Sequence, residues 1–202
     1  MLTRRFFTHG LGLLVASQAL AFGTQAENGP SIEDVLFDPD QPVLGNPDGD
    51  LSIVEYFDYQ CPFCKRNHPD LMRAVERDGN IRLLMKDWPI FGGTSTRAAQ
   101  LALGGLADGS YARAHAALMA TQGRLSNRDI DTALTDAGLS VDILQAGYQS
   151  LRSRLDGLMV RNSRQAAAFG LSGTPAFIIG TVIYPGALNA DDLDAAIRQA
   201  RG

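Results

Sequence analysis

The chain has 202 residues, a length typical of one domain with room for an insertion. Apolar residues make up 45% and charged residues 20%, as in globular proteins with a buried core. The net charge of −4 and the lack of a basic block in the sequence argue against a nucleic acid or an anionic membrane as the partner.

The first 26 residues have the features of a signal peptide rather than of a folded segment. Arg4 and Arg5 give a basic start, residues 11–21 form an apolar run, and residues 24–26 resemble a cleavage site. The apolar run is too short to span a bilayer stably. We therefore predict export to the periplasm or out of the cell.

The route of export and the cleavage point have alternatives. Residues 3–7, TRRFF, resemble the twin-arginine export signal, which we favour over two ordinary basic residues of a general secretion signal. Cleavage after Ala26 gives a mature chain that begins at Glu27, and an earlier cut after Ala21 is the alternative.

The next elements predict a β-α-β unit. Residues 27–50 hold many turn formers and are predicted to be an N-terminal extension with one short helix near 31–37. Residues 51–58 are mostly apolar, with β-branched and aromatic members, which favours a buried strand. Residues 62–78 have helical spacing, and residues 81–87 favour a second strand, parallel to the first.

The second half of the chain is predicted to be mainly helical. Apolar residues have helical spacing throughout 94–169. Two short strands follow, at 176–179 and 182–184, and a final helix starts near Asn189. The order is therefore β-α-β, several helices, then β-β-α.

The two cysteines, Cys61 and Cys64, lie three positions apart. A structural disulfide normally closes a long loop, whereas a ring of about four residues gains only about 2 kcal/mol in the chain-entropy model. Zinc needs four ligands, and only His68 is a plausible third one nearby. Covalent haem attachment would place His at the position of Lys65. We therefore predict redox chemistry, with no metal and no cofactor.

The position of the pair predicts different roles for the two thiols. Cys61 follows a strand and opens a helix, where unpaired N–H groups and the helix dipole favour a thiolate. Its pKa should fall, which makes Cys61 the nucleophile. Pro62 suits the first helical turn. Cys64 lies a turn further in and should be the buried, resolving thiol.

Two motifs together carry a resemblance to a known family. Residues 55–66, EYFDYQCPFCKR, resemble the active-site strand and helix of the DsbA-type bacterial thiol–disulfide oxidoreductases. Residues 173–177, GTPAF, resemble their cis-proline loop. The resemblance covers about residues 35–202 and implies an α/β thioredoxin fold with an inserted helical domain.

The resemblance also implies a division of the chain. A thioredoxin-like domain would comprise residues 51–93 and 170–202, with the helical insertion at 94–169, after the signal peptide at 1–26 and the extension at 27–50.

The same resemblance implies roles for three further residues. In thioredoxin-like proteins a cis-proline faces the cysteines, here Thr174-Pro175, and its neighbour offers backbone hydrogen bonds to a substrate chain. The alternative is an ordinary proline at the start of a strand. An acidic residue at the position of Glu55 lies under the resolving cysteine and assists its proton transfer, provided that burial raises its pKa. The alternative is that strand alternation turns Glu55 to solvent.

The side chains around the motif suggest a surface for unfolded substrates. Phe63 is the best exposed candidate for it, whereas most of the other nearby aromatic residues are expected in the core: Tyr56, Phe57, Tyr59, Trp88 and Phe91. Lys65 and Arg66 are expected only to tune the local potential, and His68 is expected on the helix surface.

These observations predict an exported enzyme that oxidises dithiols in unfolded or reduced exported proteins and is recycled by a redox partner protein. Phe63 stands where the strongest oxidases of the resembled family often carry His, which argues against extreme oxidising power. Isomerases of the superfamily usually carry an N-terminal dimerisation domain, for which residues 27–50 leave no room. The alternatives are an isomerase or reductase of the same fold, or an exported peptide-binding or chaperone module without turnover. The sequence indicates neither the substrate proteins nor the oligomeric state.

Overall fold

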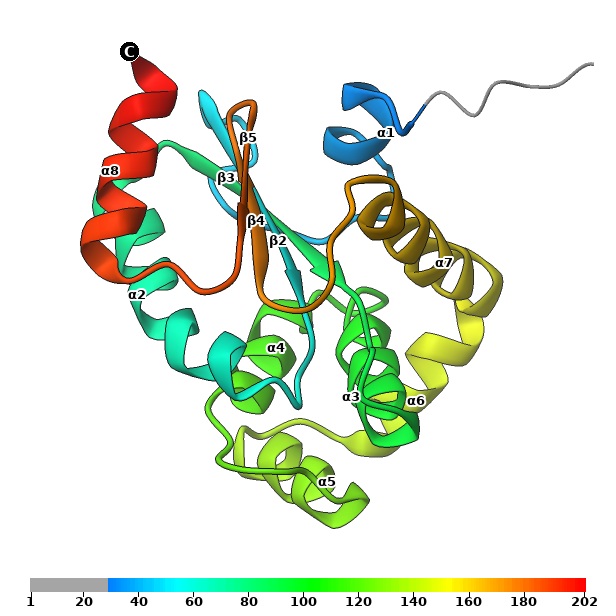
Figure 1. The fold of residues 1–202 in the computed structure, drawn as a ribbon. Coiled ribbons are helices and arrows are strands. Elements are labelled where there is room, and N and C mark those ends of the chain that lie inside the picture. Colours follow the sequence, from blue (N-terminus) through cyan, green and yellow to red (C-terminus); the bar gives the residue numbers. More distant parts are fainter. Residues whose placement is uncertain (1–28) are drawn as a thin grey trace, which may run out of the picture.

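The computed structural model describes residues 29–202, so the predicted signal peptide lies outside the described residues. The described part contains eight helices and five strands (Figure 1). They are, in chain order, α1 (Ile32–Leu36), β1 (Val43–Gly45), β2 (Leu51–Phe57), α2 (Pro62–Asp78), β3 (Ile81–Asp87), α3 (Gly93–Gly104), α4 (Tyr111–Met119), α5 (Asn127–Asp136), α6 (Val141–Ser150), α7 (Arg152–Ala168), β4 (Ala176–Ile179), β5 (Val182–Pro185) and α8 (Ala190–Arg201).

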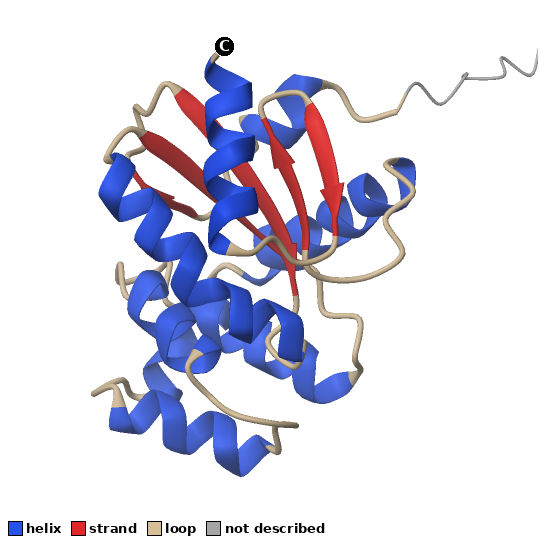
Figure 2. Ribbon diagram, turned by 60° about the vertical axis from the view of Figure 1, so that its left-hand side comes forward, coloured by secondary structure: helices blue, strands red, loops and turns tan. Residues whose placement is uncertain are grey.

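The strands form one sheet in the order β1-β3-β2-β4-β5 (Figure 2). Strands β2 and β3 are parallel, and the other neighbouring pairs are antiparallel. The predicted β-α-β unit is therefore confirmed as β2, α2 and β3. Helices α3 to α7 come between β3 and β4, which gives the predicted α/β fold with a helical insertion.

Strand β1 is the one strand of the described chain that the sequence did not predict. It has only three residues, and these lie between turn formers such as Pro42 and Asn46, so no periodicity marks it. It pairs antiparallel with β3, with Val43 opposite Leu84, and forms one edge of the sheet.

The central strand β2 is buried on both faces, which explains its nearly continuous apolar sequence. Ile53 and Phe57 belong to the larger core, with α2, α8 and the inserted helices. Val54 and Tyr56 belong to a smaller core, to which α1 and α7 also contribute. Figure 1 shows α2 and α8 on one side of the sheet and α1 and α7 on the other. Because strand side chains alternate, Glu55 shares the face of Ile53 and Phe57.

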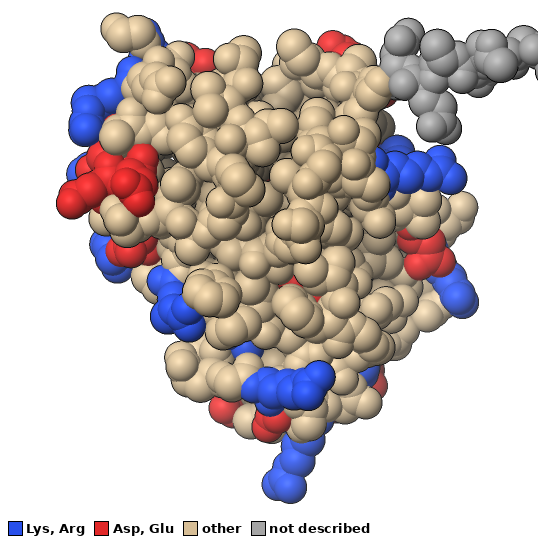
Figure 3. Space-filling view, in the orientation of Figure 1, with Lys and Arg blue, Asp and Glu red and all other residues tan. Residues whose placement is uncertain are grey.

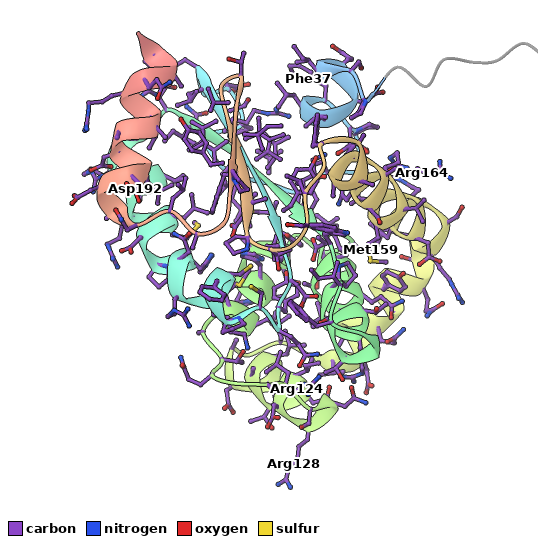
Figure 4. All side chains as sticks on the ribbon, viewed as in Figure 1. Phe37, Arg124, Arg128, Met159, Arg164 and Asp192 are labelled. Atoms are coloured by element: carbon purple, nitrogen blue, oxygen red, sulfur yellow. The ribbon has the colours of Figure 1, made fainter. Side chains whose placement is uncertain are left out.

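The inserted helices extend to one end of the molecule. Arg128 of α5 and Arg124, which lies just before α5, project at this end of the molecule. Phe37 and α1 lie at the opposite end (Figure 4). The sheet itself positions the two predicted motifs, because β2 runs into the turn before α2 and β4 begins directly after Pro175. Tyr56 pairs with Ala176 between these neighbouring strands, so both motifs meet at the same end of the sheet.

Candidate active site

Cys61 is the N-cap of α2, the residue at which the strand–turn–helix connection enters the helix. Its Sγ accepts a hydrogen bond from the Cys64 backbone N–H at 3.4 Å, one of the donors that a helix leaves free at its start. Pro62 occupies the first turn, where its missing N–H costs no helical bond. Both cysteines are free thiols and are almost completely buried, with exposed fractions of 1% for Cys61 and 0% for Cys64.

The two thiols differ strongly in acidity. Hydrogen bonding from Cys64 lowers the pKa of the Cys61 thiol to about 6, although burial acts in the opposite direction. Burial raises the pKa of the Cys64 thiol above its ordinary value, and hydrogen bonding to Cys61 and the charge of Glu55 raise it further. At neutral pH the pair therefore holds a thiolate at Cys61 and a protonated thiol at Cys64.

The Thr174–Pro175 peptide bond is cis, as the sequence predicts. It lies against the cysteine pair, because Cys61, in its protonated form, donates a hydrogen bond to the Thr174 carbonyl oxygen at 3.1 Å. The Pro175 carbonyl accepts a hydrogen bond from the Gly186 N–H, which ties the loop to the far end of β5. The two sequence motifs are thus in direct contact, although 113 positions separate Cys61 from Thr174.

Glu55 is completely buried on β2, so the alternative in which it faces solvent is wrong. Neither carboxylate oxygen forms a hydrogen bond within residues 29–202. Burial, with a smaller contribution from the charge of Cys61, raises the pKa of Glu55 to about 8. Glu55 therefore has the protonation equilibrium of a group that exchanges a proton near neutral pH.

A family model described as thioredoxin matches residues 38–199. The chain belongs to this family. A solved thioredoxin-like oxidoreductase from Silicibacter pomeroyi is 32% identical, with a TM-score of 0.80 over 85% of this chain and 98% of its own. The thiol–disulfide exchange protein alpha-DsbA2 from Wolbachia pipientis is 25% identical, with a TM-score of 0.75 over 83% of this chain and 90% of its own. A periplasmic thioredoxin-like protein from Salmonella enterica is 27% identical, with a TM-score of 0.73 over 83% and 94%.

Curated proteins of two further kinds also match the chain. A Na(+)/H(+) antiporter of Salinispora arenicola is 26% identical over 82% of this chain, and disulfide bond formation protein D of Bacillus subtilis is 35% identical over 31% of it. The chain spans about a quarter of the length of the antiporters that it matches, 26% in that case. The family and its structural relatives identify this thioredoxin-like protein as a thiol–disulfide oxidoreductase.

Asp58 is a structural residue of the oxidoreductase site that the sequence analysis missed. Its carboxylate accepts hydrogen bonds from the Gln60 and Ile90 N–H groups, both at 2.7 Å, from the Phe91 N–H at 3.1 Å and from the Ser95 hydroxyl at 2.7 Å. It thereby fixes the turn before α2 to the loop after β3. The signal in the sequence is an acidic residue directly after a buried strand, a frequent acceptor for turn N–H groups.

An apolar surface is formed by the first turn of α2 and by the loop after β3, the two segments that lie on either side of Asp58. Phe63 is 54% exposed and Phe91 is 46% exposed, and Ile90 is also exposed. The Arg66 guanidinium lies 4.4 Å above the centre of the Phe63 ring. The expectation for Phe63 is confirmed in its exposure, whereas Phe91 is exposed and not in the core.

Two other expectations around α2 need correction. Lys65 is mostly buried, and its Nζ donates a hydrogen bond to the Gly123 carbonyl at 3.1 Å, so it also holds the α4–α5 loop against α2. His68 is only partly exposed, and its ring centre lies 4.9 Å from that of His115 in α4. The interpretation of His68 as a helix-surface residue is therefore wrong, because the inserted helix α4 covers this side of α2.

Proposed function

We propose that this oxidoreductase is exported and oxidises pairs of cysteines in reduced or unfolded exported proteins. The observation that carries the proposal is the asymmetry of the two thiols: a low pKa at Cys61 and a raised pKa at Cys64, with the Thr174 carbonyl on the Cys61 sulfur. Dithiol oxidation needs this arrangement, because the sulfur that leaves must be a stable thiolate.

Oxidation proceeds in two exchanges. A substrate thiolate attacks Cys61 Sγ of the oxidised enzyme, the Cys61–Cys64 bond breaks, and its electron pair leaves on Cys64, which takes up a proton. A second substrate thiolate then attacks the substrate sulfur of the mixed disulfide and releases Cys61 as a thiolate. Two electrons pass from the substrate dithiol to the cysteine pair, and a disulfide of the redox partner later accepts them.

Re-oxidation uses the same groups in reverse order. The Cys61 thiolate attacks the partner disulfide, and Cys64 then attacks Cys61 Sγ to form the intramolecular bond. Cys64 must lose its proton in this second step, and Glu55 is the acceptor in our proposal while it is ionised, because a pKa of about 8 leaves part of it as carboxylate near neutral pH.

The acidity of Cys61 supports a moderate oxidant. A pKa of about 6 lies one unit below pH 7 and stabilises the reduced enzyme by about 1.4 kcal/mol, which corresponds to roughly 30 mV. The Phe63 side chain cannot donate a hydrogen bond to the thiolate, although its backbone N–H does. We expect a reduction potential between the values of about −270 mV for thioredoxin and about −120 mV for DsbA.

The surface around Cys61 supports unfolded chains as substrates. Phe63, Ile90 and Phe91 present exposed apolar side chains beside the site. Figure 3 has the orientation of Figure 1, so it shows the side of the molecule that carries the first turn of α2 and the start of β4. Uncharged residues cover most of its middle, and charged residues gather toward its edges. Such a surface suits apolar segments that only an unfolded protein exposes.

Export is proposed from the sequence of residues 1–26 and from the periplasmic relative. Within residues 29–202 no helix has both the length and the apolar character needed to cross a membrane. Mass spectrometry of the protein from its host should find the mature chain beginning near Glu27, and an intact chain in the cytoplasm would contradict export. Replacing both Arg4 and Arg5 by lysine should block export only on the twin-arginine route.

The direction of the reaction is tested by measuring the reduction potential together with oxidative refolding and insulin reduction on one sample. A dithiol oxidase should have a potential above about −200 mV and should accelerate oxidative refolding much more than insulin reduction. A potential near that of thioredoxin, with fast insulin reduction, would instead support a reductase. Rearrangement of scrambled disulfides as the main activity would support an isomerase. Peptide binding without exchange would support the chaperone alternative.

A further inference from the structure

Six titratable side chains gather around the inner side of the cysteine pair, five of them buried and one, from α2, partly exposed. They are Glu55, Tyr59, Asp87, Tyr111, His115 and His68. None of the ion pairs found within residues 29–202 involves this cluster. Two hydrogen bonds join its members, between Tyr59 and His115 and between Tyr111 and Asp87, whereas the Glu55 oxygens, His115 Nε2 and His68 Nδ1 have no partner within residues 29–202.

Three of these side chains form a line from the core toward the surface. The Tyr59 hydroxyl lies 2.9 Å from His115 Nδ1, and both residues are 1% exposed. The His115 ring then packs edge to face against His68, with the ring centres 4.9 Å apart. Since His68 is partly exposed, the line ends at solvent.

The imidazole rings of His68 and His115 are both in the neutral form, which can accept one proton and release another. Burial lowers the pKa of His68 to about 4, and it also lowers that of His115, so both rings are neutral at pH 7. A neutral imidazole accepts a proton at one nitrogen and releases one from the other. When Tyr59 donates to His115 Nδ1, the N–H of His115 is at Nε2, and neither this Nε2 nor His68 Nδ1 has a hydrogen-bond partner within residues 29–202.

The inner end of the line shares its electrostatic environment with the reacting thiol. Burial raises the pKa of both Cys64 and Tyr59, and the charge of Glu55 raises both further. The ring of Phe57 packs at 5.0 Å against both Tyr59 and His115 and closes this part of the core.

The other two members of the cluster form a side branch. The Tyr111 hydroxyl donates to the Asp87 carboxylate at 3.3 Å, and the Tyr111 ring stacks on His115 at 5.7 Å. Asp87 is buried, and burial raises its pKa well above the ordinary value of a carboxyl group. This branch ends inside the protein.

We propose that Tyr59, His115 and His68 conduct to solvent the proton that Cys64 releases when it resolves a mixed disulfide. This inference rests on the proposed function. In that step Cys64 Sγ bonds to Cys61 Sγ, the bond between Cys61 and the partner sulfur breaks, and its electron pair leaves on the partner thiolate. The Cys64 proton passes to Glu55, and from Glu55 over a water molecule to Tyr59, since neither Glu55 oxygen has a hydrogen-bond partner within residues 29–202.

The remaining transfers run along the line. Tyr59 gives its hydroxyl proton to His115 Nδ1 as it accepts the one from Glu55. His115 releases the proton on Nε2 to His68 over a water molecule, because no hydrogen bond joins the two rings directly, and His68 passes it to bulk water. No electron moves in these transfers, and the charge of the cluster is the same before and after each turnover.

The test measures the two steps of re-oxidation separately. Reduced enzyme is mixed with oxidised glutathione at pH 7, and acid-quenched samples are analysed by mass spectrometry for the glutathione adduct and the intramolecular disulfide. Tyr59→Phe should slow the Cys64 step at least about tenfold and leave formation of the adduct at Cys61 unchanged. Equal loss in both steps would indicate structural damage and overturn the proposal, as would an unchanged Cys64 step.

Tyr56→Phe is the matched control, because it removes a buried hydroxyl that bonds to Gln165 on the opposite face of β2. It should leave the Cys64 step within about twofold of the wild type. If both tyrosine variants slow that step equally, the route through Tyr59 is contradicted.

The outer end is tested by rescue. His68→Ala should slow the Cys64 step, and added imidazole should restore it, since His68 is reachable from solvent. A purely packing role of His68 would not respond to imidazole, and that result would overturn the exit at His68. If no adduct forms with wild-type enzyme at all, the proposed function fails instead, so the two failures are distinct.

Discussion

The two faces of the central strands surround buried acids with different partners. On the face toward α7, Arg161 binds Asp38 and Asp40 at 2.6 and 2.9 Å, and the buried Lys86 lies near these carboxylates, although its Nζ has no hydrogen-bond partner within residues 29–202. On the face toward α2 and α4, Glu55 is equally buried, but its neighbours are thiols, tyrosines and histidines.

This difference separates a structural use of buried charge from a chemical one. An ion pair holds its members in the charged state, as for Asp38, whose pKa is lowered by Arg161 against the opposing effect of burial. A buried acid without a cation lies near its titration point instead, as Glu55 does at a pKa of about 8. The thiol chemistry is found on the second face.

The largest expected effect is that of Glu55→Gln on the pH dependence of stability. Between the ordinary pKa of 4.5 and about 8, native Glu55 keeps a proton that the unfolded chain has lost, so wild-type stability falls as pH rises through this window. Glutamine does not titrate, so the variant should gain about 3–4 kcal/mol relative to wild type between pH 4.5 and pH 8. Urea unfolding of the reduced proteins at both pH values measures the gain.

Glu76→Gln removes an exposed carboxylate from α2 and controls for the loss of charge alone. A constant difference between wild type and Glu55→Gln over this pH range would mean that Glu55 is ionised in the native state, and the contrast between the two faces would be lost.

Arg161→Met should produce the next largest effect, on the other face. It leaves the nearly buried Asp38 carboxylate without its cation, and we expect a loss of about 2 kcal/mol in the free energy of unfolding. The Cys61 thiolate should still titrate near pH 6, because this network lies on the far side of the sheet.

Arg164→Met gives the comparison for Arg161→Met, since Arg164 is an exposed residue on the same helix (Figure 4). A shifted titration of Cys61 in the Arg161 variant, measured by thiolate absorbance, would show that the faces are not independent.

Asp58→Asn should have a smaller effect and represents an intermediate case, a buried acid that is satisfied by neutral donors. The new amide group would face the N–H groups of Ile90 and Phe91, which we expect to cost about 1–2 kcal/mol.

Because Asp58 holds the loop that carries the exposed Phe91, KM for a reduced protein should rise severalfold while reaction with oxidised glutathione stays unchanged. Ser95→Ala removes one of the same hydrogen bonds and should show a weaker form of the effect.

Local patterns in the sequence were sufficient for most of the fold. Helix 62–78 and strand 81–87 were predicted with their observed bounds, because apolar spacing and the Asp78-Gly79-Asn80 break mark them clearly. The three-residue strand β1 was missed because its pairing with β3 is a long-range interaction that leaves no periodicity in so short a segment.

The candidate active site, too, could be predicted from the sequence only where a local motif marks it. Cys61 and Pro175 were found because their motifs are local, and their contact follows from the pairing of β2 with β4. The contact between His68 and His115 depends on how the inserted helix α4 packs against α2, and no local pattern contains that information.

The asymmetry between Cys61 and Cys64 is tested most directly by trapping mixed disulfides on single-cysteine variants, with thiolate absorbance followed against pH. Cys64→Ser should keep a thiol of low pKa at Cys61 and accumulate substrate adducts there on non-reducing gels, because the resolving step is lost. Cys61→Ser should form no adduct and show no thiolate near neutral pH. If Cys64 instead proved to be the acidic, adduct-forming thiol, the assignment of the nucleophile to the start of α2 would be contradicted.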